Sequence, residues 1–426
     1  MVVLLTGATG FIGRHLLEAL VAAGHKVVCA VRHVSSKSGG HPRIRYVEAD
    51  FTTDCDPKIW APRLADVDAV INAVGILRER GNQTFATIHV RAPQALFTAC
   101  ATAGVRRVIQ ISALGADEAA HSRYHLSKKS ADDFLATLPL DWTIVQPSLV
   151  YGAGGTSASL FTMLASLPCI PVPGRGEQQV QPVHIDDAVQ VILALLQLPE
   201  KWRCRVPIVG PSPLTLRDFL ARLRAAMGLH RAPVLPMPMT LMQIGARVGG
   251  WLPGSLLDIE TLNMLTRGNT GAPEPTRALI GREPRAIEDF VPRGEAAAVA
   301  THAKLQWLLP LLRWSIAIVW IATGVVSLGL YPASESYALL TRVGVSAAHA
   351  PVLLYGAAAL DLFLGFATLI VRRRRWLWVA QILLILGYTL IITLKLPEFW
   401  LHPYGPVLKN LPLLAALWLL YELEPR

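Results

Sequence analysis

The sequence predicts an α/β fold: a doubly wound parallel sheet with a small substrate-side subdomain, followed by a four-helix transmembrane bundle. Up to about residue 300, short apolar runs alternate with polar turns rich in glycine and proline, as in soluble α/β proteins. A glycine-rich turn follows the first apolar run directly. After residue 300 the chain carries runs of about 20 apolar residues, the length that crosses a bilayer.

The composition excludes several classes of protein. Of 426 residues, 52% are hydrophobic and only 16% are charged, against about 25% charged in a typical soluble protein. We therefore expect no disordered chain, and no nucleic-acid partner, because the formal charge of +10 lacks a basic and aromatic stripe. The five cysteines are scattered and odd in number, so we expect no disulfide, no metal site and a reducing compartment.

The glycine-rich turn predicts a dinucleotide site. Residues 2–5 read as a buried strand, TGATGFIG follows at residues 6–13, and residues 14–23 have helical periodicity. Gly7 permits a tight turn, Gly10 lets backbone N–H groups approach a pyrophosphate, and Gly13 lets helix and strand pack closely. The helix N-terminus adds partial positive charge. The predicted contact residues of this turn are Thr6, Gly7, Thr9, Gly10, Phe11, Ile12 and Gly13.

The ends of the next three strands supply further predicted cofactor contacts. Arg32 ends the second strand, where an acid would hold the ribose hydroxyls of NAD, and its guanidinium suits a 2′-phosphate. Asp50 follows the third strand and can accept a hydrogen bond from the adenine amino group. Ala73 and Gly75 follow the fourth strand and are small enough for close approach. The sequence thus predicts NADP(H) in preference to NAD(H).

A serine, a tyrosine and a lysine predict redox chemistry. Ser112 ends a fifth strand at residues 105–112, and Tyr124 and Lys128 follow at a spacing that places both on one helical face. A neighbouring ammonium favours the phenolate form of a tyrosine, whose pKa is otherwise near ~10. Tyr124 can then protonate a carbonyl oxygen or deprotonate an alcohol. Lys128 can also bind the nicotinamide ribose, and Ser112 can hydrogen-bond the substrate oxygen.

These motifs resemble the extended and atypical short-chain dehydrogenase/reductases. The resemblance rests on TGATGFIG, ISALGA at residues 111–116, YHLSK at 124–128, QPSLVYG at 146–152 and QPVHIDD at 181–187. It covers about residues 1–295 and is strongest to the NAD(P)H-binding branch related to an accessory subunit of respiratory complex I. It implies a Rossmann domain that binds NADP, with Ser112, Tyr124 and Lys128 in the triad positions.

The substrate side is expected after the sixth strand. Pro147 and Ser148 are predicted to border the nicotinamide, and residues 210–220 and 281–285 resemble the small substrate-side domain of the same proteins. His89 departs from the family pattern, because many relatives carry an asparagine there that helps order a proton-relay water. Residues 234–266 are rich in methionine and other apolar side chains, which suits a pliable cover for a lipophilic substrate near the membrane or an ordinary core.

The C-terminal part predicts membrane spans at residues 311–331, 350–371, 376–395 and 403–421. Residues 402–418 resemble the DoxX-like membrane family. The four arginines at 372–375 place that loop in the cytoplasm, which puts the N-terminal domain and the C-terminus on the cytoplasmic side of the cell (inner) membrane. We expect no signal peptide, because a strand begins at residue 2.

Asp361 stands alone as a carboxyl group in a predicted span. Such a group usually faces a bundle interior. Its expected partners are Lys409, Asn410 or Arg313, either as a polar clamp between helices or as a proton- or quinone-linked site.

The predicted domains are residues 1–210, 211–300 and 301–426. The predicted function is a membrane-anchored NADP(H)-dependent oxidoreductase acting on a lipophilic carbonyl, alcohol or quinone-like substrate. Two alternatives stay open: a non-catalytic NAD(P)H-binding assembly factor or redox sensor with a membrane-protein partner, and a nucleotide-sugar epimerase or dehydratase.

Overall fold

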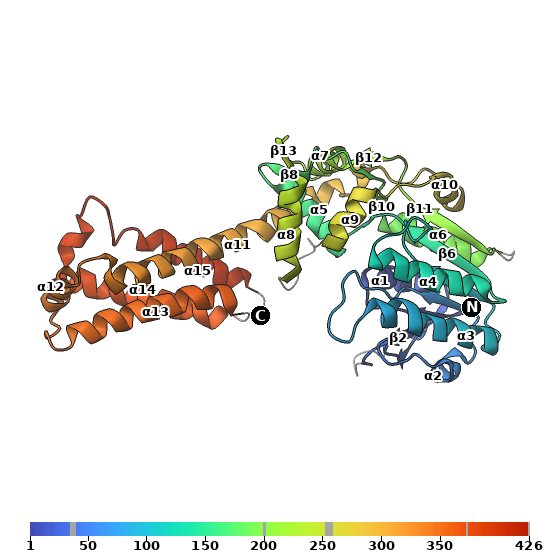
Figure 1. Ribbon diagram of the computed structural model, residues 1–426, viewed down its shortest axis with the longest axis horizontal. Helices are drawn as coiled ribbons and strands as arrows, with labels where there is room; N and C mark the ends of the chain where they lie inside the picture. The colour runs from blue at the N-terminus through green and yellow to red at the C-terminus, as the bar shows by residue number, and fades with distance from the viewer. Residues whose placement is uncertain (35–39, 199–201, 252–258, 372–373, 425–426) are drawn as a thin grey trace. The chain divides into compact units, whose positions relative to one another are not determined.

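The computed structural model describes residues 1–34, 40–198, 202–371 without 252–258, and 374–424 (Figure 1). The chain divides into two compact units, Met1–Ala303 and Lys304–Arg426.

The first unit is built on a seven-stranded parallel sheet, which confirms the predicted fold class. The strand order is β11-β6-β5-β4-β1-β2-β3, and every neighbouring pair is parallel. The chain runs outward from β1 to β3, returns to β4 beside β1, and continues outward in the other direction. The strands are β1 (Val2–Thr6), β2 (Lys26–Val31), β3 (Ile44–Glu48), β4 (Ala69–Asn72), β5 (Arg107–Ile111), β6 (Asp141–Pro147) and β11 (Cys204–Ile208).

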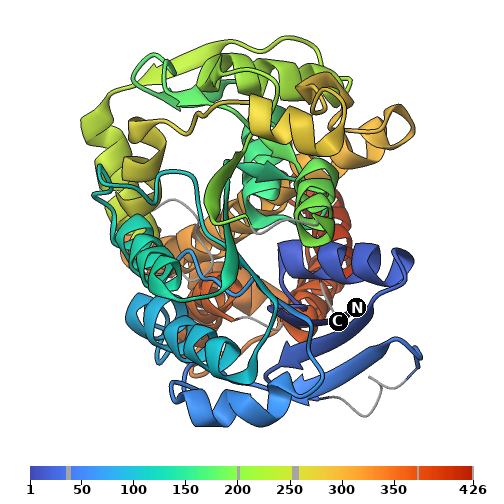
Figure 2. The ribbon, with the colours of Figure 1, turned by 90° about the vertical axis from the view of Figure 1, so that its right-hand side faces the viewer.

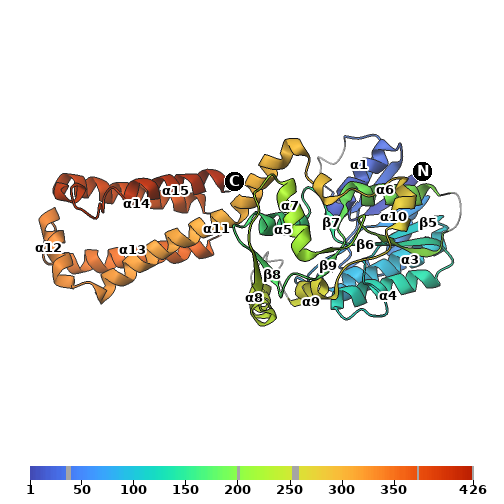
Figure 3. The same ribbon diagram turned by 90° about the horizontal axis from the view of Figure 1, so that it is seen from above.

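Helices cover both faces of this sheet (Figure 3). Strand β1 explains why both faces must be covered, because Val3 and Leu5 enter one hydrophobic cluster and Leu4 the other, and all three are fully buried. One face carries α1 (Phe11–Ala22), α6 (Ile185–Gln197) and α10 (Glu274–Ile280). The other carries α2 (Pro57–Trp60), η1 (Ala61–Leu64), η2 (Ala86–Arg91), α3 (Ala92–Ala103) and α4 (Arg123–Thr137).

A smaller subdomain lies beyond the end of the sheet within the same unit (Figure 2). Its core packs Phe161, Phe219 and Phe290 together, drawn from segments on both sides of α6. Its elements are β7 (Val150–Tyr151), α5 (Thr156–Ser166), β8 (Ile170–Pro173), β9 (Gln179–Val180), β10 (Val183–His184), β12 (Leu214–Thr215), α7 (Leu216–Ala226), β13 (Val234–Met237), α8 (Met239–Trp251), α9 (Ile259–Arg267), η3 (Ile287–Asp289) and η4 (Arg293–Glu295).

The second unit is helical, and among its described residues three helical segments are long and apolar enough to cross a membrane. These segments are Arg293–Leu330, Ala350–Ile370 and Arg375–Lys395, and the first begins in the preceding unit. The elements are α11 (Ala296–Val325), η5 (Val326–Leu330), α12 (Ala333–Val343), α13 (Ala350–Ile370), α14 (Arg375–Lys395), η6 (Pro397–Trp400) and α15 (Asn410–Leu423).

The fourth predicted span, residues 403–421, is shorter in the structure than expected. Helix α15 starts only at Asn410 and has 14 residues. At roughly 1.5 Å per residue it measures about 21 Å, below the ~30 Å of a hydrocarbon core. Pro403, Gly405 and Pro406 precede it, and proline and glycine disfavour a longer helix. Helix α12, between the first two spans, was not predicted.

The partners predicted for Asp361 are also wrong. Arg313 pairs with Glu424 at 2.8 Å, Asn410 donates a hydrogen bond to Thr389 at 2.9 Å, and Lys409 is exposed. Asp361 interacts with Thr323 of α11 instead. The sequence could not show this, because helix pairing decides which side chains meet inside a bundle.

A second polar group holds the same bundle. Trp320 of α11 donates its ring N–H to Gln381 of α14 at 2.8 Å, and Gln381 donates to Thr368 of α13 at 2.9 Å. All three side chains are buried. Arg372 and Arg373 of the predicted cytoplasmic loop lie outside the described residues, whereas Arg374 pairs with Glu424 at 3.1 Å.

Candidate nucleotide and catalytic site

The glycine turn between β1 and α1 has a backbone that only glycine allows at two positions. Gly7 has φ of +70°, and a Cβ atom there would lie 2.7 Å from the carbonyl oxygen of Ala73. A Cβ at Gly13 would lie 2.0 Å from the carbonyl oxygen of Gly7. The first turn of α1 therefore presses directly against the end of β1 and the start of the loop after β4.

This turn fits a bound pyrophosphate. Gly10 caps α1 without any side-chain hydrogen bond to the first N–H groups of the helix. Thr9 and Gly10 are exposed, and Phe11 and Ile12 are half-buried. Free N–H groups at a helix N-terminus bind anions. The site lies where β1 and β4 adjoin, which is the switch point at which doubly wound sheets bind nucleotides.

Thr6 lies beneath the turn in a buried chain of polar side chains. Its hydroxyl donates to Oδ1 of Asn72 at 2.6 Å, and Nδ2 of Asn72 donates to Oε1 of Gln110 at 2.7 Å. All three side chains are buried, and they join the carboxyl ends of β1, β4 and β5. The predictions missed Asn72 and Gln110; their signal was a polar residue inside an otherwise apolar strand.

Arg32 and Asp50 lie at the carboxyl ends of the two outer strands. Arg32 follows β2, is exposed, and makes no hydrogen bond or ion pair with any residue that the structure describes. Asp50 follows β3, and its Oδ1 accepts hydrogen bonds from the N–H and the hydroxyl of Thr52, each at 2.9 Å. The guanidinium is thus available to a ligand, while one carboxylate oxygen of Asp50 is engaged in a turn.

The ammonium of Lys128 lies at the end of β5, beside the residue that precedes Ser112. Nζ of Lys128 donates to the carbonyl oxygen of Ile111 at 3.0 Å and lies 3.5 Å from that of Val74. A Cβ on Gly75 would lie 3.1 Å from the same Nζ, so the loop after β4 passes close over the ammonium. An ammonium has three donors, and the geometry leaves one for a ligand.

Asp132 is a buried carboxyl group at the candidate site that the predictions also missed. It lies one helical turn beyond Lys128 on α4, is fully buried, and accepts a short hydrogen bond from the hydroxyl of Ser112. Its other carboxylate oxygen is buried without a partner among the described residues. Burial raises the pKa of Asp132 and lowers the pKa of Lys128, since the interior disfavours both charged forms. The signal was the i, i+4 spacing from Lys128.

The pKa of Tyr124 is higher in the structure than the sequence predicts. Burial, and then the negative charge of Asp132, raise the pKa of Tyr124 to about 12. The expectation that Lys128 lowers this pKa does not hold in the structure, where burial and the charge of Asp132 set the direction of the shift. The ring packs edge-on against Phe85 and His89, with centroids 6.1 and 5.5 Å apart. At neutral pH Tyr124 holds its proton, as a donor to a carbonyl oxygen must.

His89 connects the loop after β4 to the first turns of α4 through hydrogen bonds. It lies in the π-helical turn η2 and is 1% exposed. The N–H of Ile76 donates to Nε2 of His89 at 2.9 Å, which assigns the ring proton to Nδ1. Nδ1 then donates to Ser127 at 2.8 Å, and Ser127 donates to the carbonyl oxygen of Tyr124 at 2.7 Å.

His89 makes the first unit less stable in mild acid. Burial and the charge of Lys128 lower its pKa to about 2, so it stays neutral when folded, whereas an unfolded histidine takes up a proton below about pH 6.5. The contribution of His89 to stability must therefore fall as the pH drops below 6.5, whereas the raised pKa of Asp132 acts in the opposite direction. Between pH 7.5 and 5.5 we expect a loss of about 1.4 kcal/mol from His89. Chemical denaturation at both pH values should show that the change in stability of the wild type is more unfavourable than that of His89→Asn by about this amount; equal changes in both proteins would contradict the assignment.

Pro147 and Ser148 end β6 with their polar groups engaged inside the protein. The carbonyl oxygen of Pro147 accepts from the N–H of Leu114 at 2.9 Å. The hydroxyl of Ser148 donates to the carbonyl oxygen of Gln181 at 2.6 Å, and its side chain is buried. Pro147 therefore connects the end of β6 to the loop after β5, and Ser148 connects it to the subdomain.

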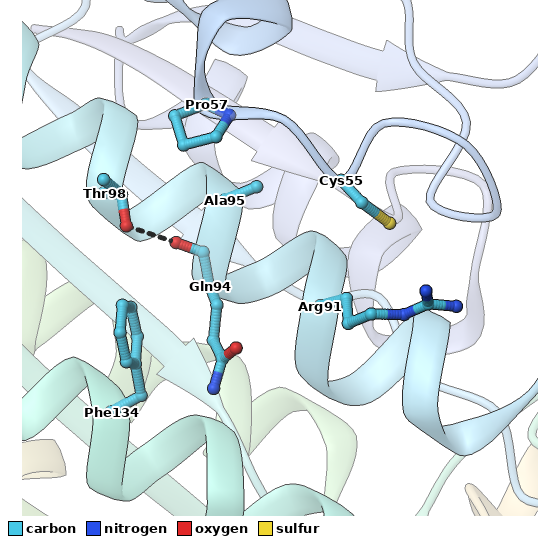
Figure 4. Close-up of a pocket in the computed structure, with 7 residues that line it drawn as sticks. All are labelled: Cys55, Pro57, Arg91, Gln94, Ala95, Thr98 and Phe134. Atoms are coloured by element: carbon cyan, nitrogen blue, oxygen red, sulfur yellow. Dashed lines mark hydrogen bonds between the residues drawn. The ribbon is translucent and has the colours of Figure 1, made fainter.

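A surface hollow of about 290 Å³ lies elsewhere in the unit, beside α3 (Figure 4). None of the residues predicted for the nucleotide or catalytic site lines it. The lining residues are Cys55, Pro57, Arg91, Gln94, Ala95, Thr98 and Phe134.

Comparison with protein families matches both units. An NAD(P)H-binding family model matches residues 7–162, and a DoxX-like family model matches residues 317–418. The chain is 30% identical to the ceramide reductase of Caulobacter vibrioides over 257 residues, which are 59% of this chain and 78% of that protein. The DoxX-like match and the three long apolar helices make this a membrane-associated protein.

Two further comparisons concern the first unit. The chain is 30% identical to the mitochondrial NADH dehydrogenase [ubiquinone] 1 alpha subcomplex subunit 9 of Arabidopsis thaliana over 199 residues, 45% of this chain and 49% of that protein. A nucleoside-diphosphate-sugar epimerase from Staphylococcus aureus has a similar fold, with a TM-score of 0.56 at 18% identity over 68% of this chain and 99% of that one. The chain therefore belongs to the NAD(P)H-binding proteins of short-chain dehydrogenase/reductase type, and it carries a C-terminal DoxX-like domain.

Proposed function

We propose that this protein is a membrane-anchored NADP(H)-dependent reductase of a lipophilic carbonyl compound. The observation that carries the proposal is the arrangement on α4 and β5, where Tyr124, Lys128 and Ser112 follow strands beside the glycine turn. When bound, the nicotinamide supplies a hydride to the carbonyl carbon. Tyr124, protonated at neutral pH, supplies the proton to the carbonyl oxygen.

The neighbouring side chains orient this donor. Lys128 holds the backbone after β5 and keeps one donor for the ribose of the cofactor. Ser112 donates its own proton to Asp132, so its hydroxyl oxygen faces the substrate as an acceptor. The hydroxyl oxygen of Ser112 therefore accepts a hydrogen bond from the product alcohol more readily than the hydroxyl donates one to the substrate carbonyl oxygen. We assign substrate contacts to the subdomain that residues 150–180 and 211–300 build.

The lipophilic substrate follows from the membrane unit and from the relative named a ceramide reductase. A bilayer concentrates apolar substrates, so a tethered enzyme meets them there; a quinone-like ring is a second carbonyl of this class. We further propose a cytoplasmic first unit and C-terminus in the cell (inner) membrane, from the basic residues at 372–375. Two of these four arginines, Arg374 and Arg375, begin α14 in the structure.

The test is transfer of deuterium. Full-length protein in lipid nanodiscs is given NADPH deuterated at either face of C4, with long-chain ketones and a cellular lipid extract. Mass spectrometry should find deuterium on the carbinol carbon of one product. If NADPH binds but no product carries deuterium, the result would favour the alternative of a non-catalytic NAD(P)H-binding protein. One relative is named as a subunit of NADH dehydrogenase, which is consistent with that alternative.

Arg32 predicts the choice between the two nucleotides. Its exposed guanidinium carries no partner in the described structure, and a charged hydrogen bond contributes about 1.5–3 kcal/mol. Arg32→Ser should therefore weaken NADPH binding by about 10- to 100-fold and leave NADH binding unchanged. Titration calorimetry in nanodiscs measures both. Arg45→Ser, another exposed arginine on the adjoining strand β3, is the control; equal losses for both nucleotides would contradict a 2′-phosphate contact.

A further inference from the structure

The surface formed by α8 and β13 exposes large apolar side chains that no other described part of the unit covers. Leu241 and Ile244 of α8 are 51% and 54% exposed, and Leu235 of β13 is 48% exposed. None of the three belongs to a hydrophobic cluster of the described residues. These three residues therefore do not belong to an ordinary core, which was one of the two interpretations of this methionine-rich segment. We call Leu235, Leu241 and Ile244 the α8 apolar face.

Helix α8 has two apolar sides, and only one of them is packed. Ala246 is the one fully buried side chain among those described in this helix, and Met239 and Met242 beside it are half-buried. Leu241 and Ile244, three residues apart, lie on a different side of the helix. Exposed Arg247 follows Ile244 by three residues and borders that side. A packed side, an unpacked apolar side and a flanking arginine are typical of a helix that lies in a membrane interface.

The charged side chains of the chain segment that contains this face favour an anionic surface, while the adjoining helix α9 carries one acid and one base, Glu260 and Arg267. Residues 227–257 contain no aspartate or glutamate. The charged or titratable side chains in this stretch are His230, Arg231 and Arg247, and all three are exposed. A second copy of this face would bring like charges together, whereas anionic lipid headgroups attract them.

We propose that α8 and β13 dock on the bilayer surface, with the α8 apolar face inserted among headgroups and upper acyl chains. The bilayer is within reach at all times, because the same chain carries the membrane-associated DoxX-like unit. Leu241, Ile244 and Leu235 leave water on docking, and Arg231 and Arg247 meet lipid phosphates. This docking requires no catalysis and stands apart from the reductase proposal.

The test measures the depth of a probe in the full-length protein. Spin labels are placed at Leu241→Cys and Ile244→Cys after Cys55, Cys169 and Cys204 are replaced by serine, and one protein is reconstituted per nanodisc with about a third anionic lipid. Collisions with oxygen, which enriches in lipid, are compared with collisions with a water-soluble nickel chelate. Thr102→Cys, exposed on α3, is the matched control.

Docking predicts that oxygen collisions exceed nickel collisions at least severalfold at both α8 positions, with the reverse at Thr102. Water-like collision rates at α8 would overturn the proposal, and protection from both reagents would show a protein contact and also overturn it. With the label at Leu235→Cys, a second substitution Ile244→Glu should shift the label toward nickel, whereas Gln243→Glu, on the polar side, should not.

Discussion

Replacement of Tyr124 by phenylalanine should lower hydride transfer by about 10²- to 10⁴-fold. The variant loses only the hydroxyl that protonates the carbonyl oxygen, because the ring keeps its contacts with Phe85 and His89. Lys128 and the glycine turn are unaltered, so NADPH affinity should stay the same. Deuterium transfer from labelled NADPH measures turnover, and titration calorimetry measures affinity.

Tyr46→Phe on strand β3 is the matched control, since it removes a hydroxyl from the same sheet away from β5. It should leave turnover unchanged. If Tyr124→Phe kept full turnover in a protein that reduces a ketone, another group would supply the proton. If it lost NADPH binding together with turnover, the tyrosine would hold the cofactor rather than the substrate oxygen.

Replacement of Gly13 by alanine should remove nucleotide binding and destabilise the first unit. The added Cβ would lie 2.0 Å from the carbonyl oxygen of Gly7 and 2.7 Å from its carbonyl carbon. Because these are backbone atoms of the glycine turn, the clash is relieved only if the turn itself moves. Overpacking of this kind costs about 1–3 kcal/mol or more. Because the turn and the start of α1 must both shift, we expect NADPH affinity to fall at least tenfold.

Thermal unfolding followed by circular dichroism, together with calorimetry, measures both effects. Gly294→Ala is the control, because a Cβ there has no atom within 4 Å. A Gly13→Ala variant with wild-type affinity and stability would show that helix and strand lie farther apart than the structure places them.

The sequence determined the strand ends and the residues that follow them. Thr6, Arg32, Ala73 and Ser112 each end or directly follow a buried apolar strand, and Asp50 closely follows the half-exposed strand β3. In a parallel sheet such positions share one edge, so a linear pattern suffices to gather them. The glycine positions are also predictable from the sequence, because a turn that lies this close to neighbouring backbone accepts only glycine at fixed spacings.

Only the tertiary structure decided the electrostatics of the site. Whether Lys128 acidifies Tyr124 depends on how far both are desolvated, and burial is set by packing across α4 and the sheet. Asp132 reaches Ser112 across 20 residues of sequence, and His89 reaches Ser127 across 38. No local pattern determines such pairs.

The membrane unit shows the same division. Hydropathy alone predicted four spans, and three of them coincide with long apolar helices among the described residues, since length and apolarity along a single helix decide whether it can cross a bilayer. The partner of Asp361 and the length of α15 depend on which helices adjoin and on where proline and glycine end a helix. These are matters of three-dimensional packing and backbone geometry, which apolar composition does not record.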